Sequence, residues 1–551
     1  MTGAEFVVST IANMGVTDVF GIPGGVVLDF LYAADKNPAL NAHLNYHEQA
    51  SAFAALGYAQ ASGKLGVAYA TRGPGIANMT TAIAEAFFES IPALFLTAHS
   101  CCVKASRRAA VDQEVDFTNA VNSFSKYSAR IDTVEDLAER FPQICDIAVS
   151  GRKGPVFVDV YSKLWGALLP ENIFAAPKDE DAVISTATVS VLSGKLRKAK
   201  RPLILIGDGV RQAGIASDIL RCADLNHIPV ISSRGSQDLL VASNRYYGYV
   251  GSHGIRYSNF ILSKCDLIIA MGNRLSFPVD SKSYKKIYDQ AEIIRIDVDE
   301  KELERQIPNS TCIKADLKEI RGVLKEITWE DTTGWLEICD RLRTELIDED
   351  LTNNVSKIVN FMKDCVAECS FVTDIGNNEF LVSRAYERVR PQVPLYCSKS
   401  FGTLGLALAK SIGVHYATKK PVVCFTGDQG FQYNIQELQY VSQWKLPIAI
   451  VVMNNSVSGM IKDREIQKYG SMLHTTLDSG YGVPSLKKIA EAYGLKYYAY
   501  ENGIVCGKSP CIIEITLDPD EKMVPYLPIG EPCQNLFPPL SRQKYDTLNG
   551  L

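Results

Sequence analysis

The sequence contains no run of about 18 apolar residues, the length that a helix needs to cross a membrane. Its 14 cysteines form no Cys-x-x-Cys pair and no Cys/His cluster at zinc spacing, which excludes the common zinc modules. Basic residues are not in excess, because 57 Lys and Arg face 62 Asp and Glu. The net charge of −5 therefore argues against nucleic acid or an anionic membrane as the main partner.

The composition is that of a soluble globular protein, with 46% hydrophobic and 22% charged residues. A length of 551 residues predicts roughly three or four domain-sized units. Residues 1–20 carry charges and helical periodicity, which is not the pattern of a signal peptide. Scattered cysteines without a pairing pattern are typical of reduced thiols, so we expect a cytoplasmic protein.

Helical and strand-like patterns alternate along the chain. In the first part, short apolar runs such as 66–70 and 93–96 are each followed or preceded by helical patterns such as 49–62 and 76–89. Repeated βα units predict doubly wound, mostly parallel sheets. We divide the chain into residues 1–165, a proline-containing and charged linker at 166–186, a second α/β region at 187–330, a third at 350–520, and a tail at 521–551.

The stretch 422–460 predicts a βαβ unit. One apolar run ends at Gly427-Asp428, and a second, at 448–453, ends just before Asn455. Between them, Asn434 with Glu437 three residues later predicts a helix start. Because parallel strands point the same way, Asp428 and Asn455 are expected side by side at the carboxyl edge of a sheet.

Carboxylate and amide oxygens are hard ligands suited to Mg²⁺, which usually completes its octahedron with water and phosphate. Glycines beside Asp428 would let backbone N–H groups approach a diphosphate. The alternative is an ordinary acidic turn followed by an asparagine-rich loop.

In the first region, two glycine-rich turns each follow a strand, at 21–25 and 71–75. Each could hold a ligand or be only a tight turn. Glu48 lies between a short strand and an alanine-rich helix. On local evidence this carboxylate either favours the helix dipole or serves a cofactor.

These motifs together resemble the acetolactate synthase and pyruvate oxidase superfamily of thiamin diphosphate (ThDP) enzymes. The Gly-Asp turn and the Asn-Asn pair resemble its cofactor motif, although Gln429 stands where the commonest form has glycine. Residues 47–59, Gly-Pro-Gly at 73–75 and Glu-Ser-Ile-Pro at 89–92 follow in the family's order. The resemblance implies three domains, for the pyrimidine (1–165), a middle domain (187–330) and the diphosphate (350–520). It implies Mg²⁺ bound by Asp428, Asn455 and the backbone of Val457.

The resemblance also implies roles for individual side chains. Glu48 would activate the cofactor through its pyrimidine ring, and Gln113 would lie near the thiazolium. His99 stands where acetolactate synthases carry glutamine, and either shuttles protons or only supports the structure. Leu404 would fold the cofactor into its bent form, or is a core leucine. The other residues implied to bind the cofactor are Gly24, Gly73, Pro74, Asn78, Asn377, Asn378, Gly402, Thr403, Gly427, Gln429, Gly430, Ser458, Gly459 and Met460.

The middle domain and the end of the chain leave more open. Residues 248–254 and 296–299 fit the flavin pattern of acetolactate synthases, whereas 272–276 departs from it. The middle domain could therefore bind FAD, bind another nucleotide or hold no ligand. Arg464 replaces the family's tryptophan and could pair with an anionic group of a larger acceptor, or lie at the surface. The tail resembles enzymes of polysaccharide gene clusters that extend nucleotide-linked keto sugars.

We therefore expect a carboligase that decarboxylates a 2-oxo acid, with pyruvate first, and transfers the two-carbon unit to an acceptor carbonyl. The acceptor would be a 2-oxo acid, an aldehyde or a nucleotide-linked keto sugar. A simple 2-oxo acid decarboxylase is the alternative, and a non-catalytic ThDP-binding regulator is a third. The family builds each active site from two subunits, so a homodimer or homotetramer is implied, without nucleic acid or membrane.

Overall fold

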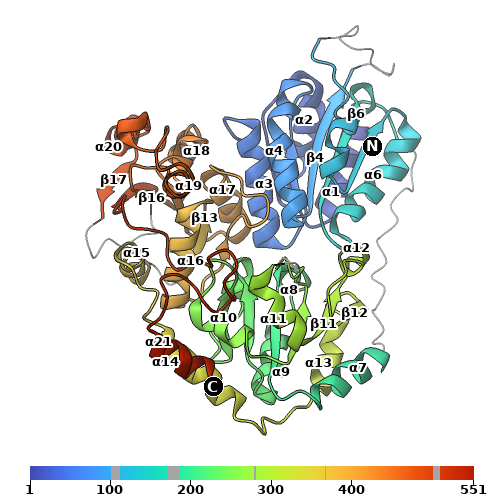
Figure 1. Ribbon diagram of the computed structural model, residues 1–551. Coiled ribbons are helices and arrows are strands. Elements are labelled where there is room, and N and C mark those ends of the chain that lie inside the picture. Colours follow the sequence, from blue (N-terminus) through green and yellow to red (C-terminus); the bar gives the residue numbers. More distant parts are fainter. Residues whose placement is uncertain (101–111, 170–185, 278–280, 366–367, 501–508) are drawn as a thin grey trace. The chain divides into compact units, whose positions relative to one another are not determined.

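The computed structural model describes the chain except for residues 101–111, 170–185, 278–280, 366–367 and 501–508. Most of the predicted linker at 166–186 lies outside the described residues. The fold is α/β, with three six-stranded sheets flanked by helices (Figure 1). The chain forms two compact units. The first contains residues 1–179, 364–379 and 396–519, and the second contains 180–363, 380–395 and 520–551.

The first sheet belongs to the first unit and has the strand order β2-β1-β3-β4-β6-β5, with parallel pairing throughout. Its strands are β1 (Asp18–Gly21), β2 (Asn41–Leu44), β3 (Gly66–Tyr69), β4 (Ala93–His99), β5 (Tyr127–Ile131) and β6 (Pro155–Tyr161). The helices around it are α1 (Gly3–Asn13), α2 (Leu28–Lys36), α3 (Glu48–Ser62), α4 (Pro74–Glu89), α5 (Phe117–Val121) and α6 (Val134–Val149). Local sequence explains the helix starts: Thr2 and Glu5 form a capping box for α1, and proline opens α4.

The third sheet has the order β14-β13-β15-β16-β18-β17 and, apart from Leu395 of β14, belongs to the first unit. Its strands are β13 (Ser370–Thr373), β14 (Leu395–Tyr396), β15 (Val422–Gly427), β16 (Ile448–Asn454), β17 (Lys496–Ala499) and β18 (Cys511–Thr516). The helices of this half are α17 (Ala407–Thr418), α18 (Glu437–Gln443), α19 (Gly459–Tyr469) and α20 (Leu486–Ala492). Helix α16 (Asn377–Val389) begins in the first unit and continues in the second. The parallel register of β15 and β16 brings their carboxyl ends together, as predicted.

Helices α3 and α17 lie side by side and join the two halves of the first unit (Figure 1). A Cβ atom on Gly413 would lie 1.7 Å from the carbonyl oxygen of Ala54, and one on Gly57 would lie 2.1 Å from that of Lys410. Only glycine allows the two backbones to approach so closely. One apolar core runs through both halves.

The second unit contains the middle sheet, with the order β12-β11-β10-β7-β8-β9. Its strands are β7 (Pro202–Ile206), β8 (Val230–Ser233), β9 (Tyr246–Val250), β10 (Leu267–Met271), β11 (Glu292–Asp297) and β12 (Ser310–Lys314). The helices are α7 (Thr186–Leu196), α8 (Asp208–Ala213), α9 (Ala216–Asn226), α10 (Arg256–Leu262), α11 (Lys282–Gln290), α12 (Glu300–Leu303), α13 (Ile320–Glu326), α14 (Trp335–Leu346), α15 (Asn353–Asp364) and α21 (Arg542–Asn549). The strand order reverses between β7 and β10, which is the usual ligand position in such sheets.

The predicted helix start at Asn434 is wrong. Helix α18 begins at Glu437, and its N-cap residue is Gln436. The Asn434 amide instead donates to the carbonyl of Gly405 at 2.7 Å, and the Glu437 carboxylate accepts from Asn45 at 2.9 Å. Both side chains of the expected capping pair therefore form tertiary hydrogen bonds instead of capping the helix.

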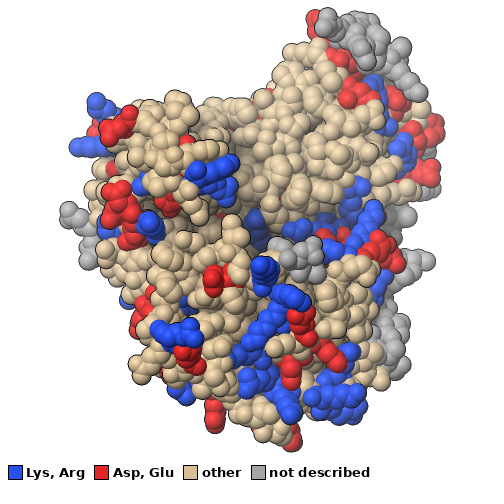
Figure 2. Space-filling view, viewed as in Figure 1, with Lys and Arg blue, Asp and Glu red and all other residues tan. Residues whose placement is uncertain are grey.

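The described helices, cysteines and surface charges can be compared with the expectations from composition. Among the described residues, no helix combines the length and apolarity that crossing a bilayer requires. The described cysteines are free and mostly buried, with Cys312 exposed. Figure 2 shows Lys and Arg side chains lying near Asp and Glu side chains on a face formed mostly by uncharged residues.

Candidate functional site

Glu48 is the first residue of α3 and directly follows the N-cap residue His47. The Nδ2 of Asn78, on the first turns of α4, donates to its Oε2 at 2.9 Å. Its Oε1 lies 3.6 Å from the position that a Cβ on Gly75 would take. The carboxylate is thus fixed between the starts of two helices at the carboxyl edge of the first sheet.

The two glycine-rich turns of this edge are in contact with each other and with Gln113. A Cβ on Gly24 would lie 2.4 Å from Cβ of Thr71. One on Gly73, whose φ is +65°, would lie 2.6 Å from the carbonyl oxygen of Gln113. We call Gly24, Glu48, Gly73, Pro74, Asn78 and Gln113 the Glu48 cluster. The fold gathers all six predicted residues at one place.

His99 ends β4 and is only 1% exposed. Its Nδ1 is bonded to Asp159 at 3.0 Å and its Nε2 to Asp132 at 2.8 Å. Burial raises the pKa of Asp159, while its bond to the imidazole lowers it. Both ring nitrogens are committed to carboxylates, which favours the supporting role among the two predicted for this histidine.

Asp428 follows β15 and is 3% exposed. Its Oδ1 accepts from the Tyr481 hydroxyl at 2.6 Å, and its Oδ2 accepts from the backbone N–H of Ser456 at 2.8 Å. Burial raises the pKa of Asp428, and these hydrogen bonds oppose that rise. The backbone N–H of Asn455 also bonds to the Asp428 carboxylate. The carboxylate and the asparagine are therefore neighbours, as the βαβ unit predicts.

The start of α19 completes this group. A Cβ on Gly459 would lie 2.8 Å from Nδ2 of Asn377 and 3.2 Å from Nδ2 of Asn455. Two predicted asparagines from different strand ends thus meet at the same glycine. We call Asn377, Asn378, Gly402, Thr403, Leu404, Gly427, Asp428, Gln429, Gly430, Asn455, Val457, Ser458, Gly459 and Met460 the Asp428 cluster.

A second buried carboxylate, Asp374, organises the loops of the Asp428 cluster. It accepts from the backbone N–H groups of Ile375 and Gly405 and from the Thr426 hydroxyl. A Cβ on Gly430 would lie 2.3 Å from its Oδ2. Burial raises the pKa of Asp374 to about 6. The carboxylate ties three loops together.

Two glutamates of α4 hold the loop at 398–405. The Thr403 hydroxyl donates to Glu85 at 2.7 Å, and the backbone N–H of Lys399 donates to Glu89 at 2.9 Å. Burial and the charge of Glu89 raise the pKa of Glu85. The helix that begins with Pro74 of the Glu48 cluster therefore ends against the Asp428 cluster.

Sequence reasoning missed most supporting residues of both clusters. Asp374, Tyr481 and Glu85 were not predicted, Glu89 appeared only within the motif at 89–92, and Glu437 was predicted only as a helix cap. The buried acidic pair on α4 and the acid on α18 carry a weak signal, because charged residues on apolar helix faces need partners. Tyr481 gave none. Arg464 is exposed on α19, so the structure does not connect it to either cluster.

The middle sheet has a Gly-Asp turn of its own, after β7. Gly207 and Gly209 pack directly on Gly272, and the backbone N–H of Gly209 donates to the Gly272 carbonyl at 3.2 Å. The Asn273 amide donates to the carbonyl of Ile206 at 3.0 Å. These groups bond to one another and fill this turn with backbone, and FAD stays a prediction.

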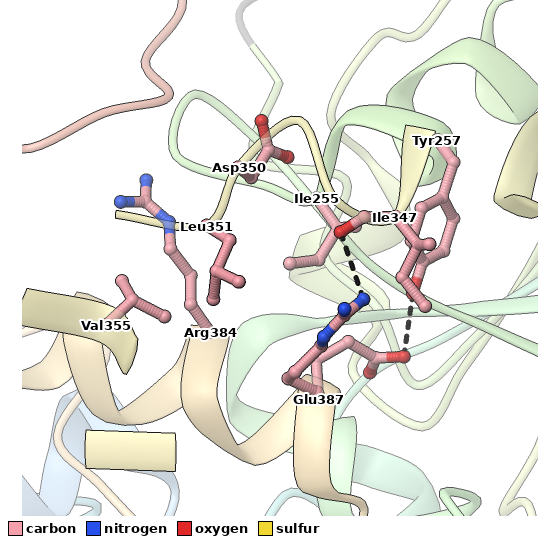
Figure 3. Close-up of a pocket in the computed structure, with 9 residues that line it drawn as sticks. Ile255, Tyr257, Ile347, Asp350, Leu351, Val355, Arg384 and Glu387 are labelled. Atoms are coloured by element: carbon pink, nitrogen blue, oxygen red, sulfur yellow. Dashed lines mark hydrogen bonds between the residues drawn. The ribbon is translucent and has the colours of Figure 1, made fainter. Parts of the chain in front are cut away.

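A pocket in the second unit lies among α10, α15 and α16 (Figure 3). Tyr257 donates to Glu387 at 2.8 Å, and Arg388 donates to the carbonyl of Ile347 at 3.4 Å. Arg256 bonds to Asp350, whose pKa is raised by burial. Much of the polar lining is thus bonded within the protein, and we assign no ligand to it.

The Asp428 cluster fits a magnesium diphosphate. Asp428 and Asn455 offer hard oxygens at one sheet edge, where a Cβ on Gly427 would meet no atom within 4 Å. The buried Oδ1 of Asn378 has no hydrogen-bond partner. The described residues contain no group of three His, Cys, Asp or Glu side chains that could hold a metal. A site of one carboxylate, one amide and a backbone carbonyl accords with that.

Comparison with known proteins gives three matches in chain order. Residues 1–120 match the thiamine pyrophosphate enzyme, N-terminal TPP binding domain; residues 191–325 match its central domain; and residues 374–508 match its C-terminal TPP binding domain. Thiamine pyrophosphate is another name for ThDP. Each match falls in a different sheet: the first includes β1 to β4, the second β7 to β12 and the third β14 to β17.

Individual proteins are similar over almost the whole chain. The probable acetolactate synthase large subunit of Methanocaldococcus jannaschii is 28% identical, covering 98% of this chain and 96% of that protein. The acetolactate synthase isozyme 2 large subunit of Escherichia coli is 28% identical, covering 98% of this chain and 100% of that protein.

The chain thus belongs to the ThDP-dependent enzymes, and over almost its whole length it is similar to acetolactate synthase large subunits. The family resemblance, the α/β fold and the expectation of a ThDP-dependent enzyme are confirmed.

Proposed function

We propose that the protein is a Mg²⁺-dependent carboligase that decarboxylates a 2-oxo acid and transfers the two-carbon unit to an acceptor carbonyl. Pyruvate is the first candidate for the 2-oxo acid. The observation that carries this proposal is the pairing of the buried Asp428 with Asn455 at one sheet edge, while Glu48 is held separately by Asn78. When bound, ThDP supplies a thiazolium ring that accepts the electron pair released as the 2-oxo acid loses CO₂.

The residues of the chain divide the work of holding the cofactor. Asp428, Asn455 and the backbone of Val457 would bind Mg²⁺, and the amide of Asn377 would meet the diphosphate. The Nδ2 of Asn378 instead donates to the Thr373 hydroxyl and to the Asp374 carbonyl, each at 2.9 Å. The buried Oδ1 of Asn378 has no hydrogen-bond partner and would accept from a donor of the bound group. Leu404 would support the bent form of the cofactor.

Glu48 would hold a proton at the pyrimidine ring. A carboxylate bonded to that ring stabilises the tautomer that can remove the thiazolium proton. Asn78 leaves the Glu48 carboxylate half-exposed and oriented, so that a ring nitrogen can reach it. His99 is bonded through both nitrogens, and proton transfer by it is not part of the proposal.

Partner copies of this chain are part of the proposal. Phe88 and Phe401 stack with ring centroids 5.2 Å apart, although the two side chains are 42% and 41% exposed. Exposed aromatic pairs of this kind are typical of interfaces. We expect at least a homodimer, which light scattering on the purified protein would establish, and the same sample's visible absorbance would show any flavin.

The proposal is tested by incubating the purified protein with ThDP, Mg²⁺ and pyruvate, alone and with candidate acceptors. CO₂ is measured and the products are identified by mass spectrometry. An adduct with a 2-oxo acid, an aldehyde or a nucleotide-linked keto sugar would establish the carboligase and its acceptor. Acetaldehyde alone would instead establish the simple decarboxylase.

A further inference from the structure

Glu437 is a buried carboxylate at the first position of α18, on the same βαβ unit as Asp428. Its side chain is 0% exposed, although the residue lies at a helix start where a carboxylate would ordinarily face water. Burial raises the pKa of Glu437 to about 7. An acidic side chain buried at this cost needs specific partners.

Those partners are the residues that lead into Glu48. Glu437 Oε2 accepts from the side-chain amide of Asn45 at 2.9 Å, and Oε1 accepts from the backbone N–H of Tyr46 at 2.9 Å. The backbone N–H of His47 is bonded to the same carboxylate. Three successive residues are therefore held by one side chain from the other half of the first unit.

The next residue along the chain is Glu48 itself. His47 is the N-cap of α3, and its Nδ1 accepts from the backbone N–H of Gln49. Fixing the peptide groups of 46 and 47 thus fixes the direction in which the Glu48 side chain leaves the backbone. Asn78 then orients the carboxylate from the opposite side.

We propose that Glu437 is a positioning residue for Glu48: its carboxylate holds the backbone at 45–47 in the one arrangement that presents Glu48 to a cofactor. This inference rests on the proposed activating role of Glu48. It adds that the helix following the metal-binding turn sets the geometry of the activating carboxylate.

Fold stability alone does not explain the arrangement. Replacing a buried charge by an uncharged group of equal size is often neutral or stabilising. A displaced catalytic group is more serious, since a shift of about 1 Å can cost roughly 100-fold in rate. Loss of the Glu437 bonds should therefore lower cofactor activation more than it lowers stability.

The experiment measures deuterium exchange at the thiazolium carbon of ThDP bound to the holoenzyme, by NMR after acid quench, at saturating ThDP and Mg²⁺. Glu437→Gln keeps the size of the side chain but turns one acceptor into an NH₂ group that faces donors. We expect exchange to slow roughly 10- to 100-fold. The ThDP affinity should stay close to that of the unchanged protein.

Two further variants make the comparison specific. Gln439→Ala changes an exposed residue of the same helix and should leave exchange unchanged. Asn45→Ala removes one of the bonds from the opposite side and should slow exchange in the same sense as Glu437→Gln. If Glu437→Gln does not fold, Asn45→Ala decides: slowed exchange with unchanged affinity supports the inference, and normal exchange overturns it.

The outcomes separate this inference from the proposed function. If the unchanged protein does not accelerate exchange over free ThDP, the activating role of Glu48 fails and the positioning role fails with it. If the unchanged protein accelerates exchange, Glu48→Gln abolishes the acceleration and Glu437→Gln exchanges normally, the proposed function stands and only the role of Glu437 is overturned.

Discussion

The third sheet and the middle sheet both carry a Gly-Asp turn at the end of a buried parallel strand, and they use it in opposite ways. After β15, a Cβ on Gly427 would meet no atom within 4 Å, and Asp428 lies beside Asn455. After β7, a Cβ on Gly207 would lie 2.2 Å from the Gly272 carbonyl oxygen. Asp208 bonds there to Arg211 at 3.1 Å. The same local sequence therefore makes an open ligand edge in one sheet and a closed packing contact in the other.

A Gly-Asp turn therefore indicates a ligand site only when the end of the adjacent strand carries a suitable residue. Asp428 can serve as a metal ligand because the neighbouring strand β16 is followed directly by Asn455, which lies beside it. The strand next to β7 delivers a glycine, whose backbone fills the space instead. The following predictions test this contrast.

The largest effect is expected when the two turns lose their carboxylates. Asp428→Ala should weaken Mg²⁺-dependent ThDP binding roughly 100- to 1,000-fold, since it removes the charged metal ligand. Asp208→Ala, at the matching place in the middle sheet, should leave ThDP binding unchanged. Calorimetric titration with ThDP, with and without Mg²⁺, measures both variants. Equal affinities for the two variants would refute the metal assignment.

The glycines should respond in the reverse order. Gly272→Ala places a Cβ 2.6 Å from Cα of Gly209, at a φ of +54°. It should therefore reduce the free energy of unfolding by roughly 2 to 4 kcal/mol. Gly427→Ala enters open space and should change the free energy of unfolding by less than about 1 kcal/mol. Urea unfolding compares them, and a larger loss from Gly427→Ala would break the contrast.

A third prediction concerns pH and the carboxylate that links the third sheet to Glu48. The pKa of Glu437 is raised from 4.5 to about 7, so the folded state binds this proton more tightly than the unfolded state. Its contribution to stability is complete below about pH 4.5 and is lost as the pH rises through 7. Glu437 faces the amide and backbone donors of 45–47, and its charge also acts on Tyr440.

Glu437→Gln should therefore gain stability relative to the unchanged protein between pH 5 and pH 8, by roughly 1 to 3 kcal/mol. Urea unfolding at the two pH values measures this. A stability difference that does not depend on pH would show that Glu437 titrates alike in the folded and unfolded states.

The smallest effect is expected from the hydroxyl that supports the metal ligand. Tyr481 donates to Oδ1 of Asp428 at 2.6 Å, and the pKa of Tyr481 is raised by burial and by that bond. Tyr481→Phe should weaken Mg²⁺ binding by up to about 10-fold, because hydrogen-bonded partners orient metal ligands. Titration with Mn²⁺, followed by its paramagnetic resonance signal, measures the affinity. Unchanged affinity would leave Tyr481 only a packing role.

Much of the fold and the centre of the site followed from the sequence. The apolar runs and turn residues predicted the βαβ unit, and the parallel rule then placed Asp428 beside Asn455. Family resemblance predicted the Glu48 cluster, which the fold gathers around Asn78 and Gly73. Both predictions depend on short stretches of sequence whose geometry is nearly fixed.

The supporting contacts could not be predicted, because they join residues far apart in the chain. Asn434 and Glu437 have the spacing of a helix cap, but their side chains bond to Gly405 and Asn45. For His99 the sequence left a proton shuttle and a supporting role open, and only the fold brings Asp159 and Asp132 to its two ring nitrogens. The local sequence pattern cannot show which distant residue forms a hydrogen bond with a polar side chain.

The central claim is that the Asp428 and Glu48 clusters together serve a ThDP- and Mg²⁺-dependent decarboxylation. The most direct measurement is CO₂ release from carboxyl-labelled pyruvate by the purified protein, with ThDP and Mg²⁺ withheld singly and together. We predict that CO₂ appears only when both are present and is lost in Glu48→Gln. CO₂ release that needs neither cofactor, or that survives in Glu48→Gln, would contradict the account.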